Sequence, residues 1–227
     1  MEELAPDLHL LPSHPAFAFN CYLAGGVLVD ASTRWARRRI LRALSGRTVS
    51  AHAITHAHAD HQGASAAVCQ ALGVPFWVGE RDVEVAEAGG PAVATPRNPV
   101  TFVQGRLWAG PGRRVDRVLR EGEEVGGFTV LETPGHAPGH VSLWRERDRV
   151  LIAGDVFFGR HPLTGRPGVH PPPDAFTPDP AANLAAMRRL ADLAPALTCF
   201  GHGPPIRDAA LLEACVERCE KPARQAT

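Results

Sequence analysis

The chain has 227 residues, a hydrophobic content of 44%, and 24 basic residues that balance 24 acidic ones. A chain of this length can bury a substantial core, and because no linker or repeat divides it we expect one domain over residues 1–227. A formal net charge of zero excludes a global basic field for nucleic acid, and no polybasic patch for a membrane is evident. The composition is therefore that of an ordinary globular protein without a nucleic-acid or membrane partner.

The N-terminal segment and the cysteines indicate the cellular compartment in which we expect the protein. Residues 1–7 are acidic and contain no long apolar stretch, which predicts neither a signal peptide nor a membrane anchor. The five cysteines stand at irregular spacing, as expected for thiols in a reducing cytoplasm. Cys215 and Cys219 are four apart on an expected helix and could share a face, so their role is left open. We expect a cytoplasmic protein.

The chain begins with expected strands and an amphipathic helix. Residues 7–13 and 17–24 are typical of strands, and Gly25-Gly26 predicts a tight turn into a third strand over residues 27–30. A helix is expected over residues 32–45, with apolar side chains on one side and arginines on much of the other. The arginines could mark an RNA surface, but no aromatic residues are interleaved with them, and we interpret them as a solvated face.

The next segment carries the densest group of metal-binding residue types. Residues 54–61 read Ile-Thr-His-Ala-His-Ala-Asp-His and begin at the end of an apolar strand expected over residues 49–55. His56 and His58 are two apart, so on an extended chain both side chains point the same way. Asp60 and His61 open a run that is typical of a helix to residue 72, which would bring all four groups together. Imidazole and carboxylate are ligands for zinc, iron and manganese, although chance clustering or a polar turn is the alternative.

Three later strands end in the same kind of residue. His136, Asp155 and His202 each follow a glycine at or just beyond the end of an expected strand, over residues 128–132, 149–153 and 196–200. Glycine permits the backbone turn that aims the next side chain, and functional sites recur at strand ends in folds of mixed α and β structure. We therefore expect these three residues to join the first cluster.

Two stretches interrupt the regular elements. Residues 89–115 and 157–178 are rich in proline and glycine, whereas a strand is expected over residues 75–78 and helices over 80–88, 180–193 and 208–220. Long irregular segments are usually functional or mobile, so we expect residues 89–115 and 157–176 to form the walls of a substrate pocket. The alternative is that they pack on the fold or form a dimer interface. The candidate substrate contacts are the apolar Phe102, Trp108, Phe157 and Phe158 and the polar Arg160 and His161.

The ordered series His-x-His-x-Asp-His, Gly-His, Gly-Asp and Gly-His resembles the metallo-β-lactamase-fold superfamily. The resemblance extends from about Asn20 to Pro205, nearly the whole chain. It implies an α+β fold, a four-layer αββα sandwich with two sheets face to face and helices outside. The residue pattern by itself predicts only a mixture of helices and strands.

The resemblance also implies a ligand set and a reaction. One metal would take His56, His58 and His136, the second would take Asp60, His61 and His202, and Asp155 would bridge them. The implied enzyme is a dinuclear hydrolase that cleaves a small ester, thioester, lactone or amide through a metal-bridging hydroxide. Two Zn²⁺ ions are the first expectation, with iron or manganese as alternatives. Asp60 would be the catalytic residue, because its second oxygen could orient the hydroxide or move its proton.

The roles of two further residues, Asp30 and His140, can each be interpreted in two ways. Asp30 matches an acidic position that the superfamily often has at the end of the N-terminal hairpin, where it would support the site. It could equally cap the following helix, as could Ser32. His140 stands four residues after His136 and is either a support of the site or an unrelated surface or core histidine.

The resemblance leaves the substrate open. Asp155 and the absence of a signal peptide disfavour the secreted β-lactamases, and the chain ends too soon after His202 for the C-terminal helical domain of glyoxalase II. The only tyrosine is Tyr22, in the N-terminal hairpin rather than in a place that matches the lactonases, and neither the arm nor the second domain of the RNA-processing branch fits. A metallohydrolase like glyoxalase II or the lactonases, acting on a small molecule, is expected.

The alternative is an oxidoreductase that resembles the persulfide dioxygenases, with one iron and a thiol-type substrate. A binding protein without activity is disfavoured because no ligand position is lost. The oligomeric state is left open, a dimer included.

Overall fold

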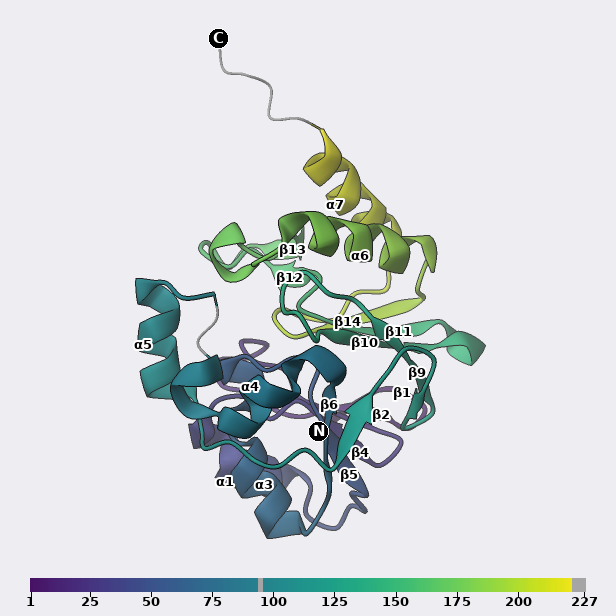
Figure 1. Cartoon of the computed structure of the whole chain (residues 1–227). Helices are drawn as coiled ribbons and strands as arrows, with labels where there is room; N and C mark the ends of the chain where they lie inside the picture. The colour runs from purple at the N-terminus through teal and green to yellow at the C-terminus, as the bar shows by residue number, and fades with distance from the viewer. Residues whose placement is uncertain (94–95, 222–227) are drawn as a thin grey trace.

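The computed structural model describes residues 1–93 and 96–221. Two sheets face each other at the centre of the molecule, with helices on the outer face of each (Figure 1). The layers follow the order of helices, sheet, sheet, helices, so the expected α+β sandwich is confirmed. Among the described residues, no helix combines the length and the hydropathy that crossing a bilayer requires.

The first sheet is built from the N-terminal half. In the described chain it has seven strands in sequence order, with antiparallel pairing from β1 to β4 and parallel pairing from β4 to β7. The strands are β1 (Glu2–Ala5), β2 (Leu8–Leu10), β3 (Tyr22–Ala24), β4 (Val27–Val29), β5 (Ala51–Ala53), β6 (Phe76–Gly79) and β7 (Arg117–Leu119). The connections between the parallel strands carry the helices α1 (Arg37–Ala43), α2 (Ala59–Gln62), α3 (Ser65–Leu72), α4 (Val83–Ala88) and α5 (Pro99–Trp108).

The second sheet is built from the C-terminal half. Its order is β14-β11-β10-β9-β8, antiparallel except for the parallel pair of β11 and β14. These strands are β8 (Glu124–Val125), β9 (Phe128–Glu132), β10 (Val141–Arg145), β11 (Val150–Gly154) and β14 (Leu197–Phe200). The helices α6 (Pro180–Asp192) and α7 (Ala210–Glu220) lie over its outer face (Figure 1). A separate hairpin of β12 (Phe158–Arg160) and β13 (Pro167–His170) follows Asp155.

The core is divided by the sheets. Tyr22, Phe128 and Ile152 belong to the apolar layer between the two sheets, and their side chains are almost fully buried. A second apolar cluster lies between β11 and the helices α6 and α7, and it includes Phe157 and Met187. Because both faces of each central strand are covered, the strands are rigid supports, and the loops at their ends are held in place.

The structure corrects the expectation for the two irregular stretches. Residues 89–115 contain a 3₁₀ turn, Gly90–Val93, and the ten-residue α5 rather than an irregular loop. Asn98 caps α5 and Pro99 occupies its first turn, a place where proline favours a helix because no backbone N–H is needed there. Residues 157–178 contain the β12–β13 hairpin and a 3₁₀ turn, Asp174–Phe176. Further 3₁₀ turns cover Arg34–Ala36, Glu80–Asp82 and Glu146–Asp148.

Candidate metal centre and substrate cavity

The histidine-rich motif lies where β5 leaves the first sheet. Thr55 is held by Asp30, whose Oδ1 accepts from the Thr55 backbone N–H at 2.7 Å. His56 lies in a bend after the strand, and His58, whose backbone is extended, is the residue before α2. Asp60 and His61 stand in the first turn of that short helix. The change from strand to helix therefore turns the four side chains toward one centre.

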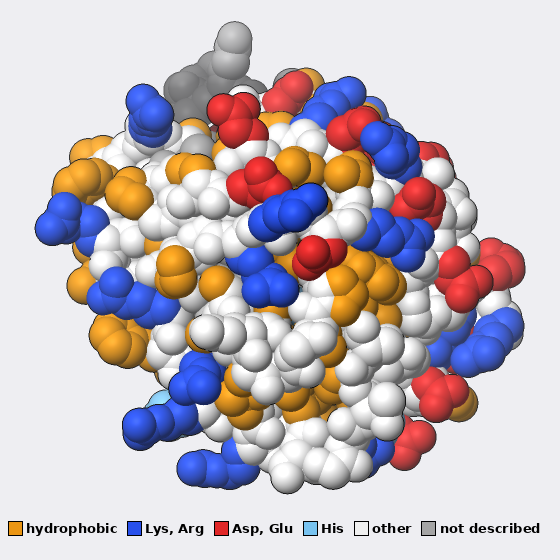
Figure 2. All heavy atoms as spheres, turned by 60° about the horizontal axis from the view of Figure 1, so that its bottom comes forward, with side chains coloured by type: hydrophobic (Ala, Val, Ile, Leu, Met, Phe, Trp, Pro, Cys, Tyr) orange, Lys and Arg blue, Asp and Glu red, His pale blue; other side chains and the backbone are white. Residues whose placement is uncertain are grey.

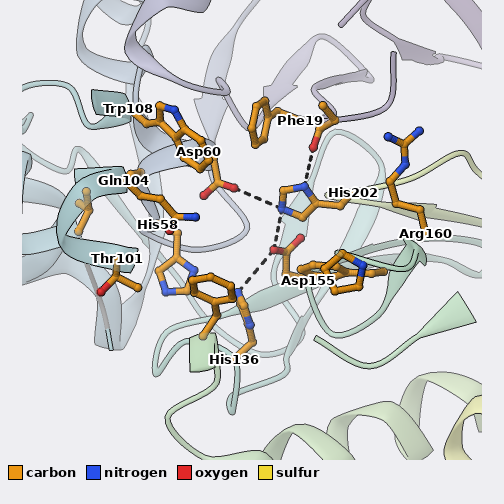
Figure 3. A pocket seen from close by; sticks show the side chains of 16 residues that line it. Phe19, His58, Asp60, Thr101, Gln104, Trp108, His136, Asp155, Arg160 and His202 are labelled. Atoms are coloured by element: carbon orange, nitrogen blue, oxygen red, sulfur yellow. Dashed lines mark hydrogen bonds and ion pairs between the residues drawn. The ribbon is translucent and has the colours of Figure 1, made fainter. Parts of the chain in front are cut away.

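The later three candidates reach the same centre from the second sheet. Asp155 lies in the middle, with its Oδ2 3.1 Å from Nε2 of His202, 3.4 Å from that of His61 and 3.5 Å from that of His136. The His56 Nε2 atom is 4.0 Å from the same oxygen and 2.9 Å from Nδ1 of His58. Asp60 Oδ2 lies 3.3 Å from His202 Nε2. Figure 3 shows His136, Asp60 and His202 placed around Asp155. All seven predicted metal ligands are thus brought together.

The second nitrogen of four imidazoles is held by an oxygen outside the cluster. The pairs are His56 Nδ1 with Thr55 Oγ1 at 3.0 Å, His61 Nδ1 with Asp30 Oδ2 at 2.9 Å, His136 Nδ1 with Thr177 Oγ1 at 3.4 Å, and His202 Nδ1 with the Ala18 carbonyl at 2.5 Å. Such partners fix the orientation of a ring and leave its other nitrogen free for a metal. Of the two interpretations of Asp30, the contacts favour support of the site.

His140 supports Asp155 rather than joining the cluster. Its Nε2 accepts the backbone N–H of Asp155 at 3.0 Å, and its Nδ1 lies 2.8 Å from Thr133 Oγ1. The approach is so close that a Cβ on Gly154 would lie 2.5 Å from the His140 ring, and Gly154 also has φ +57°. Glycine is therefore required before Asp155 for both space and backbone conformation.

Asp82 is a support that the sequence did not reveal. Its Oδ2 accepts the backbone N–H of Ala57 at 2.8 Å and its Oδ1 accepts that of Gly139 at 2.7 Å. One buried carboxylate thereby joins the loop that carries His56 and His58 to the loop that carries His136. In the sequence Asp82 stands in an ordinary charged run, and only the fold brings it between the two loops.

We predict that Asp82→Asn weakens both the fold and metal binding. An amide can accept only one of the two bonds, and its NH₂ group faces the other backbone N–H. The expected losses are about 2–4 kcal/mol of unfolding free energy and about 10–100-fold in metal affinity. Urea unfolding and metal titration measure them. Asp116→Asn is the matched control, because Asp116 accepts the Phe76 N–H at the other end of β6. An unchanged metal affinity in Asp82→Asn would contradict the assigned role.

The electrostatics of the cluster divide the imidazoles into two groups. Burial lowers the pKa of His58 to about 4 and holds the pKa of His56 and of His136 well below the ordinary value. Burial also opposes charge on His202, yet the carboxylates of Asp155 and Asp60 raise its pKa to about 10. Burial alone would raise the pKa of Asp155, but the imidazoles of His202 and His61 hold it below its usual range. The centre therefore keeps Asp155 ionised and His56, His58 and His136 neutral, whereas His202 carries a proton that a metal ion would displace.

The donor set fits metal ions. Within the described chain, the buried Nε2 atoms of His58, His61 and His136 and the buried Oδ1 of Asp155 have no hydrogen-bond partner. Unpaired buried polar atoms are costly, and four at one centre indicate a missing partner. Three overlapping groups of ligand atoms are close enough to hold an ion: His56, His58 and His136; His56, His61 and Asp155; and Asp60, His61 and His202.

A cavity of about 290 Å³ opens directly beside the cluster. His58, Asp60, His136, Asp155 and His202 form part of its lining. Aromatic rings form another part, with Phe19 in edge contact with Trp108 at 5.2 Å between centroids and Phe158 4.7 Å from His202. Figure 3 shows Trp108 and Phe19 on one side of His202 and Arg160 on the other. The remaining lining residues are Ala18, Ala59, Val93, Thr101, Gln104, Pro162 and Phe176.

The candidate substrate contacts divide into two sets. Trp108, Phe158 and Arg160 line the cavity. Phe157 does not, because its side chain is fully buried in the apolar cluster beneath α6 and α7. His161 stands outside the lining, where its Nδ1 accepts the backbone N–H groups of Leu163 and Thr164 in a turn. Phe102 is 59% exposed on the outer side of α5. The lining residues Thr101, Gln104 and Phe176 lie within the two stretches that were expected to form the walls, although they were not named as contacts, and Phe19 lies outside both stretches.

Comparison with known proteins agrees with this geometry. Residues 16–202 match the family model of the metallo-beta-lactamase superfamily. The probable metallo-hydrolase YflN of Bacillus subtilis is 28% identical, over 81% of this chain and 72% of that protein. The crystal structure of the BLEG-1 B3 metallo-beta-lactamase is 27% identical with a TM-score of 0.69, covering 90% of this chain and 95% of that one. TTHA1623, crystallised in a di-iron-bound form, is 27% identical with a TM-score of 0.63, covering 94% and 96%. The chain belongs to the metallo-beta-lactamase superfamily and is a metal-dependent hydrolase.

Proposed function

We propose that the protein hydrolyses a small ester, thioester, lactone or amide with two divalent metal ions. His56, His58 and His136 would hold one ion, Asp60, His61 and His202 would hold the other, and Asp155 would contact both. The observation that carries this proposal is the convergence of seven ligand side chains, with four buried unpaired donor atoms, on the wall of a cavity. The donor set suits Zn²⁺ first, and iron or manganese are also compatible with it.

The protein's own groups have separate tasks around such a centre. When bound, the ions would make hydroxide available near neutral pH and polarise the substrate carbonyl. Asp60 lines the cavity, and one of its oxygens lies 3.3 Å from His202, so it can orient the nucleophile or carry its proton. Thr55, Asp30 and Thr177 hold the imidazoles in fixed orientations, which limits reorganisation during the reaction.

The cavity favours a compact and partly apolar substrate. Phe19, Trp108 and Phe158 provide apolar surface, and Arg160 is the cationic side chain of the lining. One terminal nitrogen of Arg160 donates to the Ala16 carbonyl at 3.1 Å, while its buried Nε has no partner and its guanidinium has no ion pair in the described chain. Pockets of this kind combine an apolar lining with a few placed polar groups. We infer that the substrate carries at most one anionic group and that Arg160 binds it.

Elemental analysis of protein purified without added metal tests the proposal. The expected result is about two zinc ions per chain, together with hydrolysis of at least one member of a panel of chromogenic esters, thioesters, lactones and β-lactams. About one iron per chain, with oxidation of a thiol-type substrate and no hydrolysis, would instead support the persulfide dioxygenase alternative. The cytoplasmic location stays a prediction.

A further inference from the structure

The helix α5 is weakly embedded for an element that forms a wall of the cavity. Thr101, Gln104 and Trp108 face the cavity, but only Thr101 and Gly105 of the helix are buried. The outer side exposes Val100, Phe102, Val103 and Leu107, each by more than half. On the face shown in Figure 2, hydrophobic side chains are interspersed with Lys and Arg along the left edge, the side on which α5 lies in Figure 1. Apolar burial therefore does little to fix α5, and polar contacts carry more of that task.

Asn98 makes two kinds of contact at the start of this helix. Its Oδ1 accepts the backbone N–H groups of Val100 and Thr101 at 2.9 and 3.0 Å, which caps the helix. Its Nδ2 points the other way and donates to the carbonyl of Ala175 at 2.7 Å. The two halves of one amide thus join segments that are 77 residues apart in the chain.

The segment that receives this bond belongs to the site. Ala175 lies in the 3₁₀ turn Asp174–Phe176, and Phe176 lines the cavity. The next residue, Thr177, holds Nδ1 of His136 through its hydroxyl group. Asn98 therefore connects the wall formed by α5 to the wall formed by Phe176, and it does so next to the support of a predicted metal ligand.

We propose that Asn98 is a positioning residue that sets the width of the substrate cavity by tying α5 to the turn at Ala175. This inference rests on the proposed hydrolase function. The amide holds the two walls at a fixed separation, so acyl groups that fit that separation are bound and larger ones are excluded. Without the bond from Nδ2, α5 is free to swing outward while its capped first turn stays intact.

The variants Asn98→Asp and Asn98→Ala separate this role from capping. Aspartate keeps both accepted bonds and adds a charge that suits a helix N-terminus, but it cannot donate to Ala175. Alanine loses the cap and the donated bond together. If Asn98 only caps the helix, Asn98→Asp resembles the wild type and only Asn98→Ala differs. If the tie sets the cavity width, both variants change substrate selection, although only Asn98→Ala loses the stability that the cap contributes.

The first measurement compares kcat/KM for chromogenic esters with acyl chains from acetyl to octanoyl. We expect both variants to raise the ratio of octanoyl to acetyl hydrolysis by about three- to tenfold, the equivalent of one lost hydrogen bond. The thermal midpoint of Asn98→Asp should fall by less than that of Asn98→Ala, because the cap is kept, and its metal content should match the wild type. An unchanged ratio in Asn98→Asp would overturn the proposal.

The second measurement does not depend on activity. Hydrogen exchange followed by mass spectrometry should show faster exchange in the peptides that contain residues 99–108 and 173–177 in both variants. If the wild type hydrolyses no ester, thioester, lactone or amide, the proposed function fails, and hydrogen exchange still tests the tie. Wild-type exchange in Asn98→Asp would show that α5 is held by other contacts, such as the bond from Trp35 Nε1 to the Leu107 carbonyl.

Discussion

Asp155→Ala is expected to lose one metal ion or most of the hydrolytic activity while the protein remains folded. Asp155 is the carboxylate within 4.0 Å of four imidazole nitrogens, and in the proposed centre it is the protein group that contacts both ions. Its loss leaves two cations without an anion between them, and their repulsion in a buried site is then poorly offset. Because substitution of outer partners already costs up to about 100-fold in metal affinity, we expect a larger loss here.

Asp155→Ala should remain folded because the histidines that face Asp155 can become neutral. His61 and His202 lose Asp155 in this variant but keep the carboxylates of Asp30 and Asp60, respectively. An imidazole can also release its proton and remain buried in neutral form. Asp155→Asn is the matched control, because it keeps the side-chain volume and removes the charge. Circular dichroism and elemental analysis follow fold and stoichiometry separately. Wild-type stoichiometry and turnover in Asp155→Ala would show that another group bridges the metals.

The convergence of the candidate ligands could be predicted from the sequence because each is fixed by its local backbone. His56 and His58 follow a strand with a two-residue spacing, and His136, Asp155 and His202 each follow a glycine near a strand end. The direction of such side chains is decided within a few residues. The sequence also contains all five of these positions in family order, which is why the fold class could be predicted from them.

Asp30 and His140 were among the candidate supports, but Asp82 and Thr177 could not be predicted because they come from distant segments. Asp82 reaches Ala57 from 25 residues away and Gly139 from 57, and Thr177 reaches His136 from 41. Nothing in a charged run near residue 82 distinguishes a buried clamp from a solvated side chain. Residues 89–115 were expected to form a wall of the cavity, but the helix α5 within them was not predicted. The stretch was interpreted as irregular from its proline and glycine content, although a proline in a first turn favours a helix.

The second large effect is expected when either of two adjacent phenylalanines, Phe157 and Phe158, is replaced by alanine. Phe157 and Phe158 are adjacent, and both were expected to contact substrate. The chain turns after Asp155 so that Phe157 enters the core beneath α6 and α7 while Phe158 lines the cavity beside His202. Their order could not be inferred because no regular strand alternation applies at the end of β11, where the pairing with β14 is irregular.

Phe157→Ala is expected to cost about 3–5 kcal/mol of unfolding free energy, because it leaves a cavity in a fully buried cluster. The folded fraction should keep the substrate ranking of the parent, since no atom of Phe157 reaches the cavity lining. Phe158→Ala should instead change substrate binding far more than the free energy of unfolding. It removes apolar surface from the cavity, so KM for the preferred substrate should rise by about tenfold or the ranking should change, with metal content retained.

Urea unfolding and kinetics on the same two proteins decide between these outcomes, and each variant is the control for the other. Trp108→Ala extends the comparison to the opposite wall, where the indole is in edge contact with Phe19. It should alter KM as Phe158→Ala does. If Phe158→Ala and Trp108→Ala both keep the parent's kinetics on every substrate found, the substrate binds elsewhere. A large change in ranking for Phe157→Ala at full stability would mean that the chain after Asp155 is turned the other way, with Phe157 facing the metal centre.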